Sequence, residues 1–197
     1  MLGSITPLGE RGRGSRWSLT VAAYVAGSVI AATAFGAALG AIGSLWPGVP
    51  ANGRLVLLGS VVSVGLALDL HFLGTRLPTV RRQVDERWRT SYRGWVWGLG
   101  YGGQLGVGVV TIVTTSTVYA VWAAAMLSGR AVAGVTIGAT FGVARALPVF
   151  SVAGVHRPDQ LLRVDATLSR LASPAGAATY LAAAMLAVTS LVGAARW

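Results

Sequence analysis

Two ionisable residues lie within long apolar stretches of the chain, where a charged side chain could take part in binding or transport. Asp69 and Arg145 are each surrounded by apolar and small residues. A charge at the centre of a bilayer costs about 2.5–3.5 kcal/mol on insertion scales, so such residues commonly pair with one another or face a water-filled path. We therefore predict an ion pair between Asp69 and Arg145. The alternative is that both side chains extend separately to the inner membrane surface.

A glycine-rich stretch at 98–108 is followed by a run of hydroxyl side chains between positions 111 and 119. Glycine weakens a helix, so this apolar segment could be interrupted, and interrupted helices mark binding sites in transporters. The alternative is one long tilted helix whose hydroxyls bond to its own carbonyl groups. The residues expected to line a path or to form a polar cluster are Asp69, Arg145, His71, Gln104, Thr111, Thr114, Thr115 and Ser116.

Composition excludes several classes of chemistry. The chain has no cysteine, which removes disulfides, thiolate metal sites and thiol relays. Its two histidines lack metal-ligand spacing, and its glycine-rich stretch lacks the strand and the lysine of a nucleotide-binding loop. We predict a non-catalytic protein with neither metal nor cofactor. The net charge of +10 does not indicate nucleic acid, because the arginines lie between apolar runs rather than on one solvated face.

The elements that must position these residues are long apolar runs. Hydrophobic residues make up 54% of the 197 residues and charged residues 11%, whereas a soluble domain carries about 25% charged residues. Each run is near or above the roughly 20 residues that a helix needs to cross a bilayer. The sequence therefore predicts an all-α integral membrane protein with five transmembrane helices in a single domain, 17–197, after a basic cytoplasmic tail, 1–16. The expected spans are 19–46, 55–74, 95–127, 131–154 and 174–195.

The placement of arginine predicts the orientation. Arginines gather in the N-terminal tail and after the second and fourth runs, and loops rich in arginine stay in the cytoplasm. We expect a multi-pass protein of the cytoplasmic (inner) membrane with its N-terminus inside and its C-terminus outside. Segments 78–92 and 158–172 are amphipathic, so we expect them to lie on the inner surface and bind anionic lipid headgroups; the alternative is two solvated connectors. The residues expected to contact headgroups are Arg81, Arg82, Trp88 and Arg89.

Two wider patterns concern packing. Segments 17–89 and 95–170 share the order of a long glycine-rich span, a short turn, a shorter span and a basic stretch, which suggests a two-helix repeat. Small residues at four-residue spacing predict close helix contacts in a compact bundle; homo-oligomer contacts and a glycine-lined path are the alternatives. These small residues are Gly36 and Gly40; Gly59, Ser63 and Ala67; Gly98, Gly102 and Gly106; and Gly134, Gly138 and Gly142.

Two stretches resemble a known family. The text Tyr-Gly-Gly-Gln-Leu-Gly-Val-Gly-Val-Val-Thr-Ile-Val-Thr-Thr-Ser-Thr at 101–117 and Gly-Val-Ala-Arg-Ala-Leu-Pro-Val-Phe at 142–150 resemble the transmembrane part of the CcdA/DsbD cytochrome c biogenesis family. The resemblance implies a scaffold of repeated helical units with interrupted spans. That family's thiol relay uses a membrane-embedded cysteine pair that this chain lacks, and its number of spans differs from that expected here. No functional residue is therefore carried over.

Together these patterns predict a transporter of a small solute or an ion, with its path along the interrupted third span. The alternative is a non-catalytic membrane subunit, anchor or assembly factor of a larger complex. The expected partners are the lipid bilayer and anionic lipid headgroups, with a second copy of the chain or a larger membrane complex in the alternative. A transporter requires a wet cavity that reaches the hydroxyls at 111–117, whereas a subunit requires a dry bundle.

Overall fold

The described part of the chain consists of helices and the turns between them. The computed structural model describes residues 5–12, 14–72, 92–109, 113 and 115–196. These ranges contain no strand, which confirms the predicted all-α class. The elements are α1 (Pro7–Gly12), α2 (Trp17–Gly43), α3 (Ala51–Asp69), α5 (Gly94–Val107), α6 (Thr117–Leu127), α7 (Ala131–Ala146), the 3₁₀ helix η2 (Leu147–Val152) and α8 (Pro158–Ala195).

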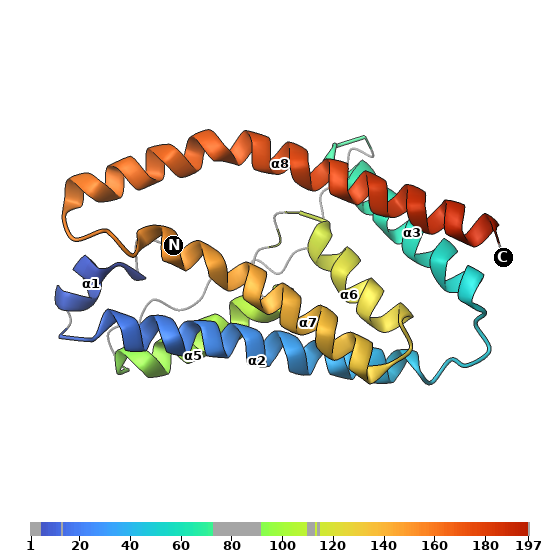
Figure 1. The fold of residues 1–197 in the computed structure, drawn as a ribbon, viewed down its shortest axis with the longest axis horizontal. Coiled ribbons are helices and arrows are strands. Elements are labelled where there is room, and N and C mark those ends of the chain that lie inside the picture. Colours follow the sequence, from blue (N-terminus) through green and yellow to red (C-terminus); the bar gives the residue numbers. More distant parts are fainter. Residues whose placement is uncertain (1–4, 13, 73–91, 110–112, 114, 197) are drawn as a thin grey trace.

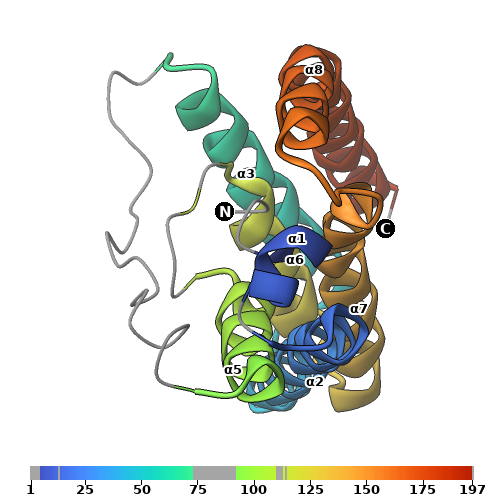
Figure 2. The same cartoon turned by 90° about the vertical axis from the view of Figure 1, so that its left-hand side faces the viewer.

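The helices form two layers. α2, α5 and α7 lie side by side in one layer and α3 and α8 form the other, with α6 between them (Figures 1 and 2). α5 runs parallel to the first half of α2, and α7 runs antiparallel to α2. α1 lies at the end of the molecule where α2 and α8 begin (Figure 1).

Four helical segments are long and apolar enough to cross a membrane by length and composition. They are α2, α3, α7 continued by η2, and α8. The third expected span, 95–127, is not among them, because it is divided into α5 and α6. The single tilted helix considered for this segment is therefore not observed, and the interrupted alternative is.

α2 approaches α5 and α7 so closely that their backbones are in contact. A Cβ placed on Gly98 would lie 2.6 Å from the Thr20 carbonyl oxygen, and one placed on Gly142 would lie 2.8 Å from the Ser28 carbonyl oxygen. The Ser28 hydroxyl donates a hydrogen bond to the Gly142 carbonyl oxygen at 3.0 Å. Only small residues allow such an approach. The predicted contacts are thus confirmed in this layer, where Gly36, Gly40, Gly102, Gly106, Gly134 and Gly138 are also buried.

The α3–α8 pair uses a different face of α3 from the one expected. The buried residues of α3 are Gly59, Val62 and Gly65, whereas Ser63 is exposed. A Cβ placed on Gly59 would lie 2.7 Å from the Cγ of Leu191 in α8. The predicted seam of Gly59, Ser63 and Ala67 is therefore wrong. The physical reason is that α3 has two partners, since Gly59 faces α8 while Gly65 faces the beginning of α6.

The expected surface segment 158–172 and the expected span 174–195 form one continuous helix. α8 has 38 residues and passes through Pro174, because a proline inside a helix removes one hydrogen bond and can be accommodated by a bend. Figure 1 shows α8 as a curved helix along one side of the molecule. The other expected surface segment, 78–92, lies outside the described residues except for Tyr92.

The N-terminal segment is packed against the bundle rather than extended as a free tail. Ile5, Thr6 and Glu10 are buried. The Leu8 backbone N–H donates a hydrogen bond to the Val155 carbonyl oxygen at 3.2 Å, and the Trp17 indole N–H donates one to the Ile5 carbonyl oxygen at 3.0 Å. The segment therefore closes the end of the bundle where α2 begins.

The two expected repeat units differ in structure. The first contains the continuous helix α2, whereas its counterpart in the second is divided into α5 and α6. α7 lies along α2, but α3 packs chiefly against α8. The suggested two-helix repeat is therefore not visible as a repeated packing arrangement.

Candidate functional site at the helix break

The break between α5 and α6 lies beside the middle of α2. α5 ends at Val107, and Gly108 follows with a φ of 77°, a left-handed conformation that favours glycine. A Cβ placed on Gly106 would lie 2.7 Å from the Cα of Ser28, which is near the midpoint of the 27-residue helix α2. The chain thus leaves helical geometry halfway along the longest helix of its layer.

The carbonyl end of α5 is capped by a side chain from α6. The Trp122 indole N–H donates a hydrogen bond to the Val107 carbonyl oxygen at 2.9 Å. Phe35 and Phe141 pack edge-on against Trp122, with ring centroids 4.9 and 5.0 Å away. The last carbonyls of a helix have no partner within that helix, so Trp122 satisfies one of them inside an aromatic cluster.

The amino end of α6 is capped by Asp69, the last residue of α3. The Asp69 carboxylate accepts hydrogen bonds from the Ser116 backbone N–H at 2.9 and 3.1 Å and from the Ser116 hydroxyl at 2.7 Å. A carboxylate is favoured there by the unpaired N–H groups and the dipole of the helix. A Cβ placed on Gly65 would lie 2.7 Å from the Ser116 Cβ, so the glycine makes room for this contact. Asp69 therefore joins α3 to α6.

The predicted ion pair between Asp69 and Arg145 is not formed. Asp69 is bonded to Ser116, and the guanidinium carbon of Arg145 lies 5.5 Å from the ring centre of Phe141, one turn earlier in α7. Each charge has a local partner, since the carboxylate binds a helix end and the cation faces an aromatic ring. A bridge between α3 and α7 is therefore not needed to stabilise either one.

The other predicted path residues are not brought together. His71 is exposed, with a left-handed φ of 59°. Gln104 is partly exposed in α5, and its backbone carbonyl accepts a hydrogen bond from the Gly108 N–H at 3.3 Å. Of the predicted set, only Asp69 and Ser116 are bonded to each other within the part of the chain that the structure describes. Outside that part lie Thr111, Thr114, Arg81, Arg82, Trp88 and Arg89.

The N-terminal segment holds a buried carboxylate that was not expected from the sequence. Glu10 is fully buried, and its Oε2 accepts a hydrogen bond from the Thr20 hydroxyl at 2.9 Å. A Cβ placed on Gly94 would lie 2.5 Å from the Thr20 hydroxyl oxygen and 3.0 Å from Glu10 Oε2, so α5 must begin with glycine here. The available signal was that Glu10 is the only acidic residue before Asp69, in an otherwise basic tail.

Arg54 holds the opposite end of the bundle together. Its guanidinium donates hydrogen bonds to the carbonyl oxygens of Trp46 at 3.0 Å, Val49 at 3.2 Å and Leu127 at 3.4 Å. These carbonyls belong to the α2–α3 turn and to the end of α6. The side chain thus has a structural role in fixing that turn against α6.

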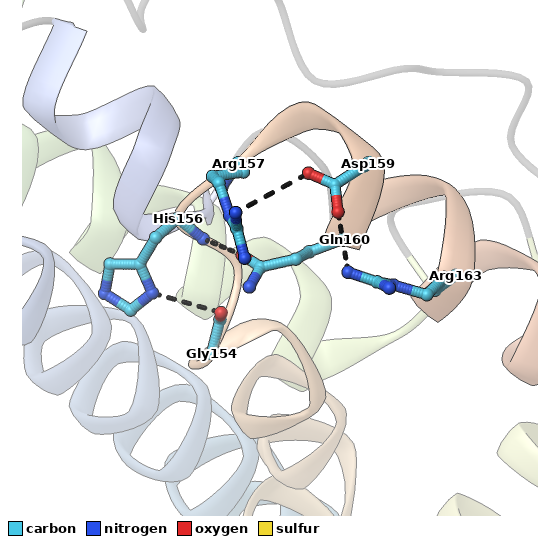
Figure 3. Close-up of polar contacts among 6 residues, drawn as sticks. All are labelled: Gly154, His156, Arg157, Asp159, Gln160 and Arg163. Atoms are coloured by element: carbon cyan, nitrogen blue, oxygen red, sulfur yellow. Dashed lines mark hydrogen bonds and ion pairs between the residues drawn. The ribbon is translucent and has the colours of Figure 1, made fainter.

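A cluster of polar side chains lies on the surface at the start of α8 (Figure 3). The side-chain oxygen of Gln160 accepts hydrogen bonds from the backbone N–H groups of His156 at 2.7 Å and Arg157 at 3.0 Å. Asp159 and Arg163 form an ion pair at 2.6 Å between exposed side chains. Exposed ion pairs contribute little to stability, so this cluster mainly fixes the helix start.

Comparison with known proteins finds similar curated sequences. The chain is 37% identical over 153 residues to methylamine utilization protein MauF of Paracoccus versutus. The aligned region covers 74% of this chain and 56% of the relative. MauF of Methylophilus methylotrophus is 35% identical over 152 residues, with coverages of 75% and 53%. MauF of Paracoccus denitrificans is 37% identical over 174 residues, with coverages of 85% and 61%. The chain therefore spans little more than half the length of these relatives.

No family model matches the chain, and no solved structure matches it. The curated relatives correct the predicted family, because they are named as MauF proteins and not as CcdA/DsbD proteins. The earlier resemblance depended on small and hydroxyl-bearing residues, which many membrane helices share. The names of these relatives also show that the prediction of a transporter is wrong. The alternative prediction, a membrane subunit, anchor or assembly factor of a larger complex, does not match these names either. Over 74% or more of its length, the chain is similar to proteins of methylamine utilization.

Proposed function

We propose that this chain acts in methylamine utilization as an integral protein of the cytoplasmic membrane. The observation that carries the proposal is the 37% identity to MauF of Paracoccus denitrificans over 85% of the chain. Because the relatives are longer, the proposal concerns the helical part that they share with this chain.

The proposed membrane arrangement has five crossings. α2, α3, α7 with η2, and α8 each have the length and composition for one crossing, and α5 and α6 together would make another. The arginine-rich N-terminal tail supports an inside N-terminus, and five crossings then put the C-terminus outside. In this arrangement the break between α5 and α6 lies near the middle of the bilayer.

We place the functional centre at that break. Backbone that leaves helical geometry at membrane depth must have its polar groups satisfied by protein or by a water-filled cavity. Here Asp69 supports the amino end of α6 and Trp122 supports the carbonyl end of α5. A change in the Asp69–Ser116 contact would alter how α3 and α6 are joined without removing any helix.

The orientation can be tested with single cysteines, because the chain has none of its own. Gly48, in the turn after α2, and Gly154, before α8, have no atom within 4 Å of an added Cβ, so both should tolerate substitution. We expect a membrane-impermeant maleimide to label Gly48→Cys in spheroplasts and Gly154→Cys only after lysis. Labelling of both variants from the same side would contradict the arrangement.

The function itself is tested by growth on methylamine. A Paracoccus denitrificans strain that lacks MauF and no longer grows on methylamine would receive either this chain alone or a hybrid in which the chain replaces the matching part of the resident MauF. We expect the hybrid to restore growth on methylamine, with growth on succinate unchanged as the control. A hybrid that reaches the membrane at the resident level but restores no growth would contradict the proposal.

A further inference from the structure

Three side chains with hydrogen-bond donors lie near one another where α2, α5 and α7 pack together. The rings of Tyr24 in α2 and Tyr101 in α5 have centroids 5.8 Å apart. Arg145 in α7 lies over the Phe141 ring at 5.5 Å. It is one turn from Gly142, whose carbonyl oxygen accepts a hydrogen bond from Ser28 of the antiparallel helix α2, one turn after Tyr24. Two phenols and a guanidinium therefore share one region of the layer.

All three groups are donors that the described residues leave without an acceptor. Within the ranges that the structure describes, neither phenol nor the guanidinium forms a hydrogen bond or an ion pair. Tyr24 is only 5% exposed, whereas Tyr101 and Arg145 are partly exposed, so the cluster can be reached from the surface. These donors are therefore available to an acceptor that the described residues do not supply.

The described acidic residues cannot complete the cluster. Glu10 binds Thr20, Asp69 binds Ser116, and Asp159 pairs with an arginine of α8. The fourth described acidic residue, Asp165, is exposed on α8. A group that completes the cluster would accept several hydrogen bonds at once and carry negative charge opposite Arg145, whose described partner is only the Phe141 ring. A phosphate group meets both requirements, because its oxygens accept bidentate hydrogen bonds from arginine.

The position of the cluster indicates where the phosphate comes from. Tyr24 is seven residues after the beginning of α2 at Trp17, about 10 Å along the helix at about 1.5 Å per residue. α2 is about 40 Å long by the same rise, whereas the hydrocarbon core is about 30 Å thick. If α2 crosses the membrane centrally, Tyr24 lies close to the inner headgroup boundary, and the chain's net charge of +10 attracts anionic lipid there.

We propose that Arg145, Tyr24 and Tyr101 form a binding site for a phosphate group, supplied by an anionic lipid of the inner leaflet. The lipid as source rests on the proposed membrane placement, whereas the donor cluster itself does not. The site is distinct from the helix break, whose polar ends are already satisfied by Asp69 and Trp122.

The test is a lipid titration of the purified full chain, followed by native mass spectrometry. Phosphatidylglycerol would be compared with phosphatidylcholine, and Arg145→Gln with the control Arg170→Gln, which removes an exposed arginine of α8. We expect Arg145→Gln to weaken phosphatidylglycerol binding about tenfold or more, as for the loss of a charged hydrogen bond, and Arg170→Gln to change it less than about twofold. Combined Tyr24→Phe and Tyr101→Phe should weaken it about threefold to tenfold, with thermal melting to show that the fold is kept.

A second titration with inorganic phosphate separates the two sources of the group. Binding of phosphatidylglycerol that resists excess inorganic phosphate supports the lipid, and displacement by inorganic phosphate supports a free anion at the same donors. If Arg145→Gln and Arg170→Gln bind phosphatidylglycerol and inorganic phosphate equally well, the proposal is overturned. Failure of the membrane placement would appear separately, as a chain absent from the membrane fraction that still binds inorganic phosphate through Arg145.

Discussion

The two helix layers are packed in different ways. In the most apolar 18-residue stretches of α2 and of α7 with η2, 28% of the residues are buried in the chain, against 11% in α3 and α8. The α2–α5–α7 layer is held by backbone contacts at glycine, as between Gly98 and Thr20. In the α3–α8 pair, the larger side chain of Leu191 covers Gly59. At such backbone contacts the first layer has no space for added atoms, whereas the second can adjust by moving side chains.

The space between the two layers is not completely filled. A pocket of about 320 Å³ lies among α3, α6, α7 and α8, and its lining is mainly apolar. The hydroxyl oxygen of Thr117 on its wall is buried without a hydrogen-bond partner. The Asp69–Ser116 contact at the edge of this region joins α3, in the less densely packed layer, to α6, which lies between the layers.

The largest expected effect is a side chain inserted into the rigid layer. A Cβ on Gly102 would lie 2.8 Å from the backbone carbon of Tyr24, so Gly102→Leu must separate α5 from α2. We expect a loss of about 3 kcal/mol or more, the upper end of overpacking effects, measured as the unfolding free energy in detergent. Gly176→Leu in α8 is the matched control, because nothing lies within 4 Å of its added Cβ. Equal stability of the two variants would remove the contrast between the layers.

A smaller effect is expected where α3 is joined to α6. Asp69→Ala removes the acceptor of both the Ser116 N–H and its hydroxyl, and should cost about 2–3 kcal/mol. Hydrogen exchange should rise in α6 more than in α7, since α6 loses its cap. Ser63→Ala, on an exposed position of the same helix, should leave both quantities unchanged. If exchange in α6 does not change, Asp69 does not support the helix start.

The N-terminal segment should depend on its buried carboxylate. Thr20→Val removes the hydroxyl that donates to Glu10 and should cost about 1–2 kcal/mol, because a charged acceptor loses a buried donor. Limited proteolysis within 5–16 should become faster, since that segment detaches first. Thr167→Val, whose exposed hydroxyl bonds only within α8, serves as the control. Unchanged cleavage in Thr20→Val would show that this bond does not fix the segment.

The smallest effect is expected at the exposed start of α8. Asp159→Asn breaks the ion pair with Arg163, and exposed pairs of this kind contribute about 0.5 kcal/mol or less. The unfolding free energy should therefore stay within that range, and the small difference should shrink further at high salt. A loss as large as that of Thr20→Val would mean that this surface cluster supports the fold.

Helix type, the positions of the long apolar runs and the glycine contacts of one layer could be predicted from the sequence. These features depend on local composition and on spacing along a single helix, as with Gly134, Gly138 and Gly142. Whether the third span, 95–127, is continuous or interrupted could not be decided from the sequence. A stretch rich in glycine and hydroxyl side chains is compatible with a long helix as well as with a break.

The partners of polar residues could not be predicted, because they depend on how helices meet. Asp69 and Arg145 are the two charges inside apolar runs, and pairing them is the simplest solution in the absence of a fold. The chain instead uses Asp69 for a helix end that exists only because α5 and α6 are separate. The burial of Glu10 and its bond to Thr20 could not be predicted either, since they require the N-terminal segment to fold back onto α2.

The central claim is that the helix break clamped by Asp69 serves methylamine utilization. The most direct measurement is the growth rate on methylamine of the Paracoccus denitrificans hybrid strain carrying Asp69→Asn, which keeps an acceptor for the Ser116 N–H but removes the charge. Ser63→Ala is the control, and both variants must reach wild-type levels in the membrane. We expect Asp69→Asn to slow growth on methylamine severely, with growth on succinate unchanged and with Ser63→Ala growing normally on both. Wild-type growth on methylamine with Asp69→Asn would contradict the claim.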